Sequence, residues 1–255
     1  MEEITNVELS YLSMQDYQSL KSTMIRSYPR LKDPFWKEEE IRCLLDKFPK
    51  GQVSVKVNGT VVGCALSIVV KHEDFGRQHN YEDVTTSGSF ERHTDSGDTL
   101  YGLDVVVKPE FRGLRLGRRL YEYRKEICEQ LNLKGIILGG RIPNYHKHAD
   151  QLSPREYIQK VRSKEIHDPV LDFQISNDFF PKLILKNYLK GDHDSRENAV
   201  LLEWSNIYYE PKSRQPEIHR KEVRLGLIQW QMRPYANMEQ LMVQVKYFHS
   251  HPIGI

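Results

Sequence analysis

The chain has 255 residues, of which 39% are hydrophobic and 28% are charged, and its formal net charge is +2. This length fits one large domain or one domain with part of another, and the apolar content is enough for a buried core, which excludes a disordered chain. The balanced charge gives no overall support for nucleic-acid binding.

The cysteines and the N-terminal residues indicate the compartment. Cys43, Cys64 and Cys128 are far apart and form no CxxC pair, which favours a reducing environment over a disulfide framework or a zinc site. Residues 1–10 are polar and acidic, unlike a signal peptide, and the apolar run at 61–70 is too short to span a bilayer. We therefore expect a cytoplasmic protein that does not associate with membranes.

The first hundred residues predict strands and helices followed by a polar excursion. In chain order we expect a strand at 4–12, helices at 16–28 and 35–48, and strands at 53–57 and 61–70. Asn58-Gly59 predicts a tight turn between the last two strands, which form a hairpin. Residues 71–99 are polar without periodicity, and a loop of this length inside a domain is usually functional or disordered.

The second half of the chain predicts a strand–helix–strand unit and further strands. We expect a strand at 100–107, a helix at 114–131, a strand at 135–140, a helix at 153–165, and strands at 181–189 and 199–206. The first three elements form a right-handed βαβ unit. Residues 171–180 are ambiguous between helix and strand, and residues 207–222, with two prolines and many charges, are typical of a linker.

Glycine and arginine are concentrated at the turn between strand 100–107 and helix 114–131. The turn contains Arg112, Gly113, Arg115, Gly117, Arg118 and Arg119. A helix N-terminus presents unpaired N–H groups and the positive end of the helix dipole, so this turn can bind a pyrophosphate. The alternative is a solvated basic helix end. A P-loop and a Rossmann fingerprint are excluded, because neither GK[ST] nor GxGxxG is present.

The stretch VVVKPEFRGLRLGRRL at 105–120 resembles the GNAT superfamily of acetyl-CoA-dependent N-acyltransferases. Their signature is a strand, a V-x-P break and [RQ]-x-x-G-x-[GA] at a helix start. The resemblance covers residues 3–206 and implies an α/β GNAT fold, with a mixed central sheet flanked by helices. Arg115 departs from the signature, because it occupies the position of the first glycine.

The resemblance also implies a cosubstrate and its binding residues. The cosubstrate is acetyl-CoA, with no metal: strand backbone would hold the pantetheine arm and the turn its pyrophosphate. The residues implied are Val105, Val106, Val107, Arg112, Gly113, Leu114, Arg115, Leu116, Gly117, Arg118 and Asn144. In this mechanism an amine attacks the thioester directly, and catalysis depends mainly on positioning and on polarisation of the thioester carbonyl.

The expected catalytic residues are Asp104 and Tyr157. Alternation on the strand places the Asp104 side chain opposite Leu103 and Val105, where it acts as base or orients the amine; the alternative is a structural carboxylate. Tyr157 is the preferred acid over Tyr145, with packing roles as the alternative for both. The histidines have no recognised metal-ligand spacing.

Residues 223–255 resemble the opening strand and helix of a nitrilase-type carbon–nitrogen hydrolase. None of the cysteines follows that strand, so this chain is expected to lack hydrolase activity. The predicted organisation is an acetyltransferase domain at 1–206, a linker at 207–222 and a truncated hydrolase start at 223–255. The expected acceptor is a small-molecule or peptide amine. We expect no nucleic-acid partner, and the chain can be a monomer or a homodimer. The alternative function is a non-catalytic acyl-CoA-binding module that regulates a hydrolase.

Overall fold

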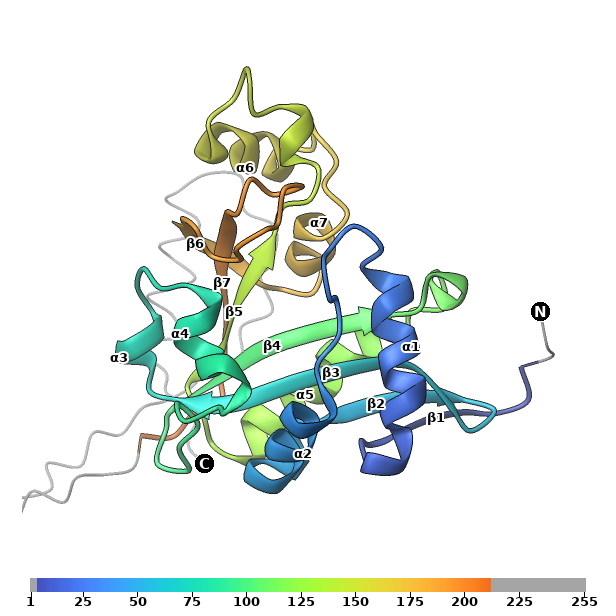
Figure 1. Cartoon of the computed structure of the whole chain (residues 1–255). Helices are drawn as coiled ribbons and strands as arrows, with labels where there is room; N and C mark the ends of the chain where they lie inside the picture. The colour runs from blue at the N-terminus through green and yellow to red at the C-terminus, as the bar shows by residue number, and fades with distance from the viewer. Residues whose placement is uncertain (1–3, 212–255) are drawn as a thin grey trace, which may run out of the picture. The chain divides into compact units, whose positions relative to one another are not determined.

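The computed structural model describes residues 4–211, which form a central sheet with helices on both faces (Figure 1). The strands are β1 (Val7–Tyr11), β2 (Val53–Val57), β3 (Thr60–Val70), β4 (Thr99–Val107), β5 (Gly135–Arg141), β6 (Phe180–Leu185) and β7 (Ala199–Ser205). The α-helices are α1 (Tyr17–Ser27), α2 (Glu38–Lys47), α3 (His72–Phe75), α4 (Tyr81–Thr85), α5 (Leu116–Gln130), α6 (Pro154–Arg162) and α7 (Leu171–Ile175). The short 3-10 helices are η1 (Met14–Asp16), η2 (Pro49–Gly51), η3 (Thr86–Gly88), η4 (Pro109–Phe111) and η5 (Tyr145–Lys147).

Local sequence explains several element boundaries. Asn58 and Gly59 both adopt positive φ, at 48° and 80°, which is the conformation that a tight hairpin turn requires. Helix α6 begins with a capping box, in which the Ser153 side chain accepts from the Glu156 N–H, and Pro154 occupies the first turn. These three signals are readable in the sequence, and the predicted hairpin and helix are present.

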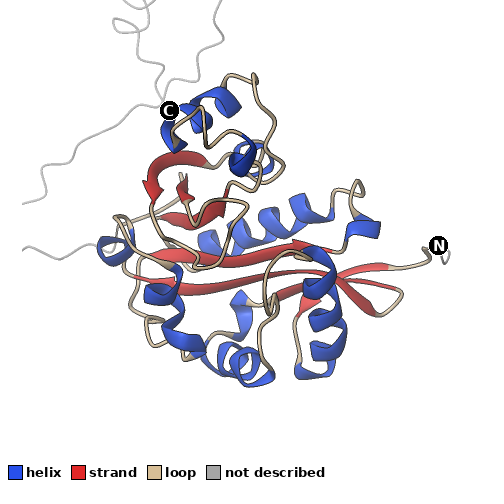
Figure 2. Cartoon of the chain, turned by 45° about the horizontal axis from the view of Figure 1, so that its top comes forward, coloured by secondary structure: helices blue, strands red, loops and turns tan. Residues whose placement is uncertain are grey.

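The strands of the described residues form one mixed sheet in the order β1-β2-β3-β4-β5-β7-β6. Strands β4 and β5 pair in parallel, and every other neighbouring pair is antiparallel. The helix α5 connects β4 to β5, as expected for a βαβ crossover. Figure 2 shows helices on both faces of this sheet, so that two apolar layers are covered.

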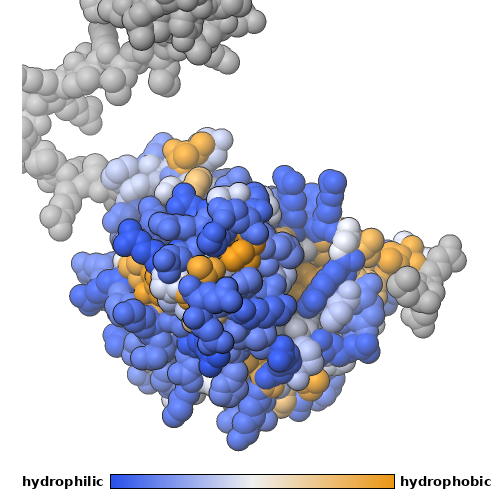
Figure 3. Space-filling view, turned by 90° about the horizontal axis from the view of Figure 1, so that it is seen from above, coloured by the Kyte–Doolittle hydropathy of each residue, from blue (hydrophilic) through white to orange (hydrophobic). Residues whose placement is uncertain are grey.

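Two hydrophobic cores lie on opposite faces of the sheet. The first core contains residues of α5, α6 and α7, such as Leu120 and Val161, packed on β2–β5 and β7. The second contains residues of α1 and α2, such as Leu20 and Leu44, packed on β3–β7. Hydrophilic residues cover most of the face seen from above (Figure 3). Among the described residues, no helix has the length and apolar character needed to cross a membrane.

Strands β4 and β5 separate halfway along their length. Their pairing runs from Thr99 with Gly135 to Gly102 with Leu138 and then stops. Beyond that point β4 stays paired with β3, and β5 with β7. The sheet therefore opens into a wedge between residues 103–107 and residues 139–141, which we call the β4–β5 wedge.

The structure differs from the sequence-based expectations in two segments. The excursion at 71–99 is ordered by α3, α4 and η3, which are too short to give a helical periodicity. The ambiguous segment 171–180 begins as the helix α7, and β6 starts at Phe180. The predicted hydrolase-like start at 223–255 and residues 212–222 of the predicted linker lie outside the described residues.

Candidate active site

The turn before α5 presents a row of free backbone N–H groups. Gly113 and Arg115 both adopt positive φ, at 87° and 59°. Among the described residues, no acceptor takes the backbone N–H of any residue from 113 to 118. Successive free N–H groups at a helix start form a concave site for an anion. Arg115 therefore has the left-handed backbone conformation that glycine adopts most readily, and its side chain adds positive charge.

The arginines of this turn remain at the surface. Arg112 donates from Nε to the Val107 carbonyl at 3.3 Å, which folds the turn back onto the end of β4. Arg118 donates to Glu122 at 3.0 Å, one helical turn further on. Residues 112–115 are exposed, so the N–H groups and the guanidinium of Arg115 face solvent. The turn is thus electropositive and open to a ligand.

A surface hollow lies beside the same turn. A Cβ on Gly117 would lie 2.9 Å from the ring of Phe173 in α7, so this glycine allows α7 to pack against the start of α5. Phe173 also lines a hollow of about 520 Å³, whose lining residues are Lys164, Ile166, His167, Pro169, Asp172, Phe173 and Ser176. The hollow is therefore adjacent to the electropositive turn, on the face of α5.

Beyond Gly102 no strand pairs with the wedge edge of β4, although the Val107 carbonyl there accepts from Arg112 Nε and Ser27 Oγ, each at 3.3 Å. Lys108 donates its N–H to the Val62 carbonyl on β3 at 2.8 Å. Because hydrogen-bonding directions alternate along a strand, Val105 and Val107 direct their backbone groups away from β3, toward the wedge. An extended ligand can therefore pair with β4 there as an additional strand.

A buried arginine fills the start of the wedge. Arg124 of α5 is 2% exposed and donates from Nη2 to the carbonyls of Leu66 at 3.0 Å and Asp104 at 2.7 Å. These two residues pair across β3 and β4 next to a bulge at Leu103. Gly102 makes room, since a Cβ there would lie 2.7 Å from Arg124 Nη1. Arg124 therefore donates to one carbonyl on each strand at the bulge, where the ladder is irregular.

The bulge also corrects the predicted orientation of Asp104. Leu103 packs in the core that contains α1 and α2, and Asp104 accepts from the hydroxyl of Tyr28, which packs against that core. The prediction that these neighbours point to opposite faces was wrong, because a bulge inserts one residue and interrupts the alternation. Val105, as predicted, lies on the other face, against the first core.

Asp104 is a partly buried carboxyl group with a phenol donor. Its side chain accepts from Tyr28 Oη at 2.6 Å. Burial raises the pKa of Asp104, although hydrogen bonds from the Tyr28 and Trp36 side chains and the charge of Arg124 act against this shift. Burial and the neighbouring Asp104 charge raise the pKa of Tyr28 well above 10, which keeps its hydroxyl protonated. A carboxylate with a raised pKa is a stronger proton acceptor than an ordinary aspartate.

Aromatic side chains surround this carboxyl group. Trp36 and Tyr81 lie with ring centroids 6.0 Å apart, and Tyr81 and Tyr188 lie 5.6 Å apart. Tyr81 Oη donates to the Leu103 carbonyl at 3.3 Å, which ties α4 to the bulge. We call Tyr28, Trp36, Tyr81 and Tyr188 the aromatic wall. Such a wall beside a carboxylate is a suitable environment for a cationic amine.

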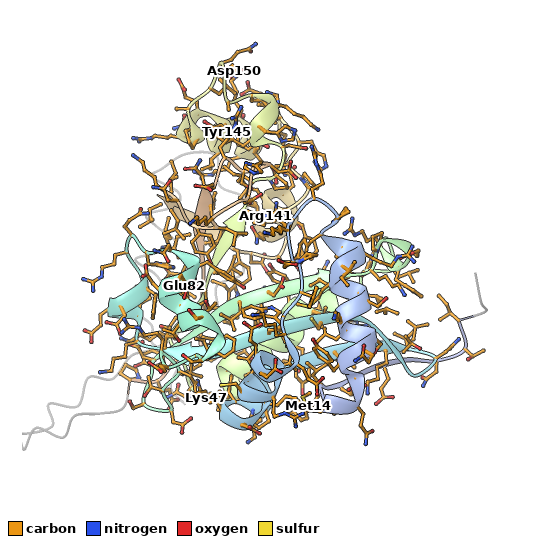
Figure 4. The ribbon with its side chains drawn as sticks, viewed as in Figure 1. Met14, Lys47, Glu82, Arg141, Tyr145 and Asp150 are labelled. Carbon is orange, nitrogen blue, oxygen red and sulfur yellow. The ribbon has the colours of Figure 1, made fainter. Side chains whose placement is uncertain are left out.

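The wedge is bordered at the end of β5 by a buried ion pair. Arg141 donates from Nε to Asp192 at 2.7 Å, and its guanidinium lies 5.9 Å from the centre of the Tyr28 ring. Figure 4 shows Arg141 beside the connection between α1 and α2. Arg30 of that connection pairs with Asp194 at 3.2 Å. The α1–α2 and β6–β7 connections are therefore joined.

The structure does not bring Tyr157, the predicted acid, to Asp104, and it gives Asn144, predicted to bind the cosubstrate, partners within the protein. Tyr157 is fully buried in the first core, and its hydroxyl donates to Asp168 at 2.7 Å. Burial and this hydrogen bond raise the pKa of Tyr157, so the phenol is held as a structural donor. Asn144 donates its side-chain N–H to the His167 carbonyl and accepts from Lys147. The alternative acid, Tyr145, donates to the Leu152 carbonyl at 3.0 Å.

Sequence reasoning missed Tyr28, Trp36, Arg124 and Arg141. Arg124 had a readable signal, because it continues the i, i+4 series of Leu116 and Leu120 on the apolar face of α5. A charge in that stripe indicates a buried partner. The other three come from the α1–α2 connection and from the end of β5, and they meet only through tertiary packing. In the part of the chain that the structure describes, no group of three or more His, Cys, Asp or Glu side chains is arranged to hold a metal ion.

Comparison with known proteins agrees with this geometry. Residues 14–149 match the model of the Acetyltransferase (GNAT) family. The chain is 38% identical over 216 residues to "Probable hydrolase YhcX" of Bacillus subtilis (strain 168), covering 84% of this chain but only 42% of that protein. It is 32% identical over 178 residues to "Uncharacterized N-acetyltransferase YkwB" of the same organism, covering 70% of this chain and 78% of that one.

Two solved structures share the fold. The loading GNATL domain of CurA from Lyngbya majuscula has a TM-score of 0.69 at 22% identity, and covers 79% of this chain and 98% of that one. The GNAT-like decarboxylase GphF in complex with isobutyryl-CoA has a TM-score of 0.68 at 19% identity, and covers 78% and 98%. The fold, the family model and the identity to the second Bacillus protein agree, and the chain belongs to the GNAT acetyltransferase family.

Proposed function

We propose that this chain transfers an acetyl group from acetyl-CoA to a primary amine, by direct attack of the amine on the thioester in a ternary complex. The observation that carries the proposal is the row of free N–H groups at residues 113–118, which begins at the end of the open β4–β5 wedge. An anion site continuous with an unpaired strand edge fits a ligand with a pyrophosphate and an extended amide-bearing arm.

The residues present fit coenzyme A. The N–H groups of residues 113–118 would hold the pyrophosphate, and Arg115 would add charge-assisted hydrogen bonds. The backbone of Val105 and Val107 would pair with the pantetheine arm. The neighbouring hollow, which includes Lys164 and His167, would receive the adenosine part. The similar GphF structure, which holds isobutyryl-CoA, supports an acyl-CoA as the class of donor.

Asp104 is the proposed base. Its carboxylate would attract the ammonium form of the acceptor and take one proton, which leaves a neutral amine able to attack the thioester. The aromatic wall would surround the same ammonium group. Tyr28, which already donates to Asp104 at 2.6 Å, takes the place of Tyr157 as the phenol next to the reacting groups.

The joined loops favour a small acceptor over a peptide. Arg30 and Asp194 connect the α1–α2 and β6–β7 connections, and Arg141 lies over Tyr28 at the end of the wedge. A peptide would need these contacts to open, at the cost of exposing the buried carboxylate of Asp192. A small amine needs no such change. We therefore propose a small-molecule amine as the acceptor class.

The alternative is a non-catalytic acyl-CoA-binding module that regulates a carbon–nitrogen hydrolase. It is favoured by the 38% identity to a protein named as a probable hydrolase, of which this chain covers 42%. In this alternative Asp104 is a structural carboxylate, and acyl-CoA binding alone is the function. The domain boundaries predicted at 206 and 222 belong to the same proposal.

Titration calorimetry tests the cosubstrate. Acetyl-CoA and isobutyryl-CoA are titrated into the full chain and into Arg115→Glu, which reverses one charge in the anion site. We expect micromolar binding that weakens at least tenfold in the variant. Lys47→Glu, an equivalent change at an exposed residue on the α2 face of the sheet, is the control and is expected to bind normally. No binding to either acyl-CoA by the wild-type chain refutes both functions.

Turnover with a panel of small amines and a peptide, followed by release of free thiol, separates the two functions. Asp104→Asn is expected to bind acetyl-CoA normally and to lose about 100-fold in kcat, because the base is removed. Asp46→Asn, an exposed carboxylate on α2, is the control. Binding of acetyl-CoA without turnover in the wild-type chain establishes the alternative function. Turnover that Asp104→Asn leaves unchanged removes Asp104 from the mechanism.

A further inference from the structure

Three buried side chains form a continuous hydrogen-bonded chain on the α1–α2 face of the sheet. Tyr188 Oη lies 3.0 Å from Tyr101 Oη, and Tyr101 Oη lies 2.8 Å from His79 Nε2. His79 Nδ1 lies 2.7 Å from the Arg77 carbonyl oxygen. Tyr101 is fully buried, Tyr188 is 4% exposed and His79 is 7% exposed. The steps proposed above use Tyr188 only as part of the aromatic wall and leave its hydroxyl, Tyr101 and His79 without a role.

The contacts determine the direction of every hydrogen bond. A carbonyl oxygen only accepts, so Nδ1 of His79 carries the ring proton, and Nε2 of the neutral ring is an acceptor. Tyr101 therefore donates to His79, and Tyr188 donates to Tyr101. Burial lowers the pKa of His79, although the Arg77 carbonyl and the charge of Asp83 raise it, so the ring is neutral at pH 7. All donors thus point from Tyr188 toward His79.

The Tyr188 end of this chain lies at the start of the β4–β5 wedge. Gly139 is the first residue of β5 after the pairing of Gly102 with Leu138 ends. A Cβ on Gly139 would lie 2.4 Å from Tyr188 Oη, so the hydroxyl occupies the space that the glycine leaves. Since the Tyr188 proton is directed to Tyr101, the lone pairs of its oxygen are available on the wedge side.

Tyr188 and Asp104 border the same face of the wedge. Tyr188 belongs to the core that contains α1 and α2, as does Leu103, and Tyr28, the phenol donor to Asp104, packs against that core. The ring of Tyr81 contacts Tyr188 and its hydroxyl reaches the Leu103 carbonyl. An amine bound beside Asp104 would therefore lie next to the free lone pairs of Tyr188.

We propose that Tyr188, Tyr101 and His79 form a proton relay that carries the second amine proton from the β4–β5 wedge to the surface near α3. Tyr188 is the group that faces the reacting amine, whereas Tyr101 and His79 act through it. The inference rests on the proposed acetyl transfer and assigns the destination of a proton that Asp104 alone does not accommodate.

The acceptor ammonium group loses two protons as the amide forms. Asp104 takes the first proton of the ammonium group, and the neutral amine attacks the thioester carbon. The C–S bond breaks as the amide forms. The nitrogen gives its second proton to the Tyr188 oxygen. At the same time Tyr188 passes its own proton to Tyr101, and Tyr101 passes its own proton to Nε2 of His79. The CoA thiolate takes the proton held by Asp104. His79 then carries a proton on both ring nitrogens and releases the one on Nδ1, beside the Arg77 carbonyl, to water. Tautomer exchange of the neutral ring restores the starting chain, so each turnover yields amide, free thiol and one proton.

Phenylalanine substitutions test the relay in the full chain with acetyl-CoA and an active amine. Tyr188→Phe removes one oxygen and is expected to lower kcat about 30- to 100-fold and to change the solvent deuterium isotope effect, with the Kd for acetyl-CoA unchanged. Tyr145→Phe is the matched control, a buried tyrosine of the other core whose hydroxyl donates to the Leu152 carbonyl. An unchanged kcat and isotope effect in Tyr188→Phe overturns the relay while the acetyl transfer stands.

Chemical rescue separates a relay from a packing role of His79. His79→Ala is expected to lose about as much kcat as Tyr188→Phe and to recover part of it with added imidazole, in proportion to the neutral form of the added base. Rescue that is absent although the variant binds acetyl-CoA normally overturns the assignment of His79. If wild-type turnover is absent altogether, the acetyl transfer and the relay both fail.

A measurement that needs no turnover tests the direction. Imidazole ¹⁵N chemical shifts of the wild-type chain are expected to show His79 neutral, with the proton on Nδ1 and Nε2 as acceptor. In Tyr101→Phe the Nε2 shift is expected to move toward that of an unbonded nitrogen. A proton found on Nε2 reverses the direction of the chain and overturns the relay.

Discussion

Replacement of Arg124 by methionine gives the most direct test of how the wedge is built. Arg124 donates to the carbonyls of Leu66 and Asp104, and its side chain is inaccessible to solvent. Methionine has a similar length and no donor. Two buried carbonyls that lose their partner cost about 1–3 kcal/mol each, and relief from burying a cation offsets part of this cost. We expect a net loss of about 3 kcal/mol of unfolding free energy.

A loss of this size lowers the Tm by about 6–12 °C for a domain of this size. Urea unfolding followed by circular dichroism gives the free energy, and Arg119→Met is the matched control, because Arg119 lies on the same helix with a 75% exposed side chain. The control is expected to change stability by less than about 0.5 kcal/mol. If Arg124→Met is as stable as this control, the carbonyls are satisfied in another way and the explanation of the bulge fails.

Two further predictions concern Arg115 and the Arg141–Asp192 pair. Arg115 has a left-handed φ of 59°, which glycine adopts without strain, so Arg115→Gly is expected to keep or raise the Tm. The same change removes a positive charge and is expected to weaken acetyl-CoA binding about fivefold. A lower Tm in thermal melts would contradict the expected relief of strain. Burial raises the pKa of Asp192, but hydrogen bonds and charge from Arg141 outweigh it and lower the pKa below 3.8. The pair therefore stabilises the fold above pH 3.8 and less as the pH falls through the folded pKa. Asp192→Asn should cost about 3 kcal/mol at pH 7 and progressively less below pH 4 in melts across pH, whereas a pH-independent difference would exclude the ion pair as its cause.

Local signals were sufficient for most of the fold. Asn58-Gly59 predicts the hairpin, and the Ser153-Pro154 start predicts α6, because turn and cap geometry depend on a few adjacent residues. The strand, break and glycine–arginine turn at 105–120 predicted the family and the anion site. These features are encoded by neighbouring residues, so a reader of the sequence can find them without knowing the tertiary contacts.

The acceptor side could not be read in this way. The carboxyl group of Asp104 was predicted, but the bulge at Leu103 that orients it arises from pairing with β3 and from the guanidinium of Arg124 on a helix 20 residues later in the chain. Tyr157 was predicted as the acid from the family resemblance. In the structure it lies in the first core, where its hydroxyl donates a hydrogen bond to Asp168. The sequence therefore determined the strand–turn–helix that we propose as the donor site. Tertiary packing alone determined which phenols and charges surround Asp104, because they come from segments far apart in the chain that meet only across the open sheet.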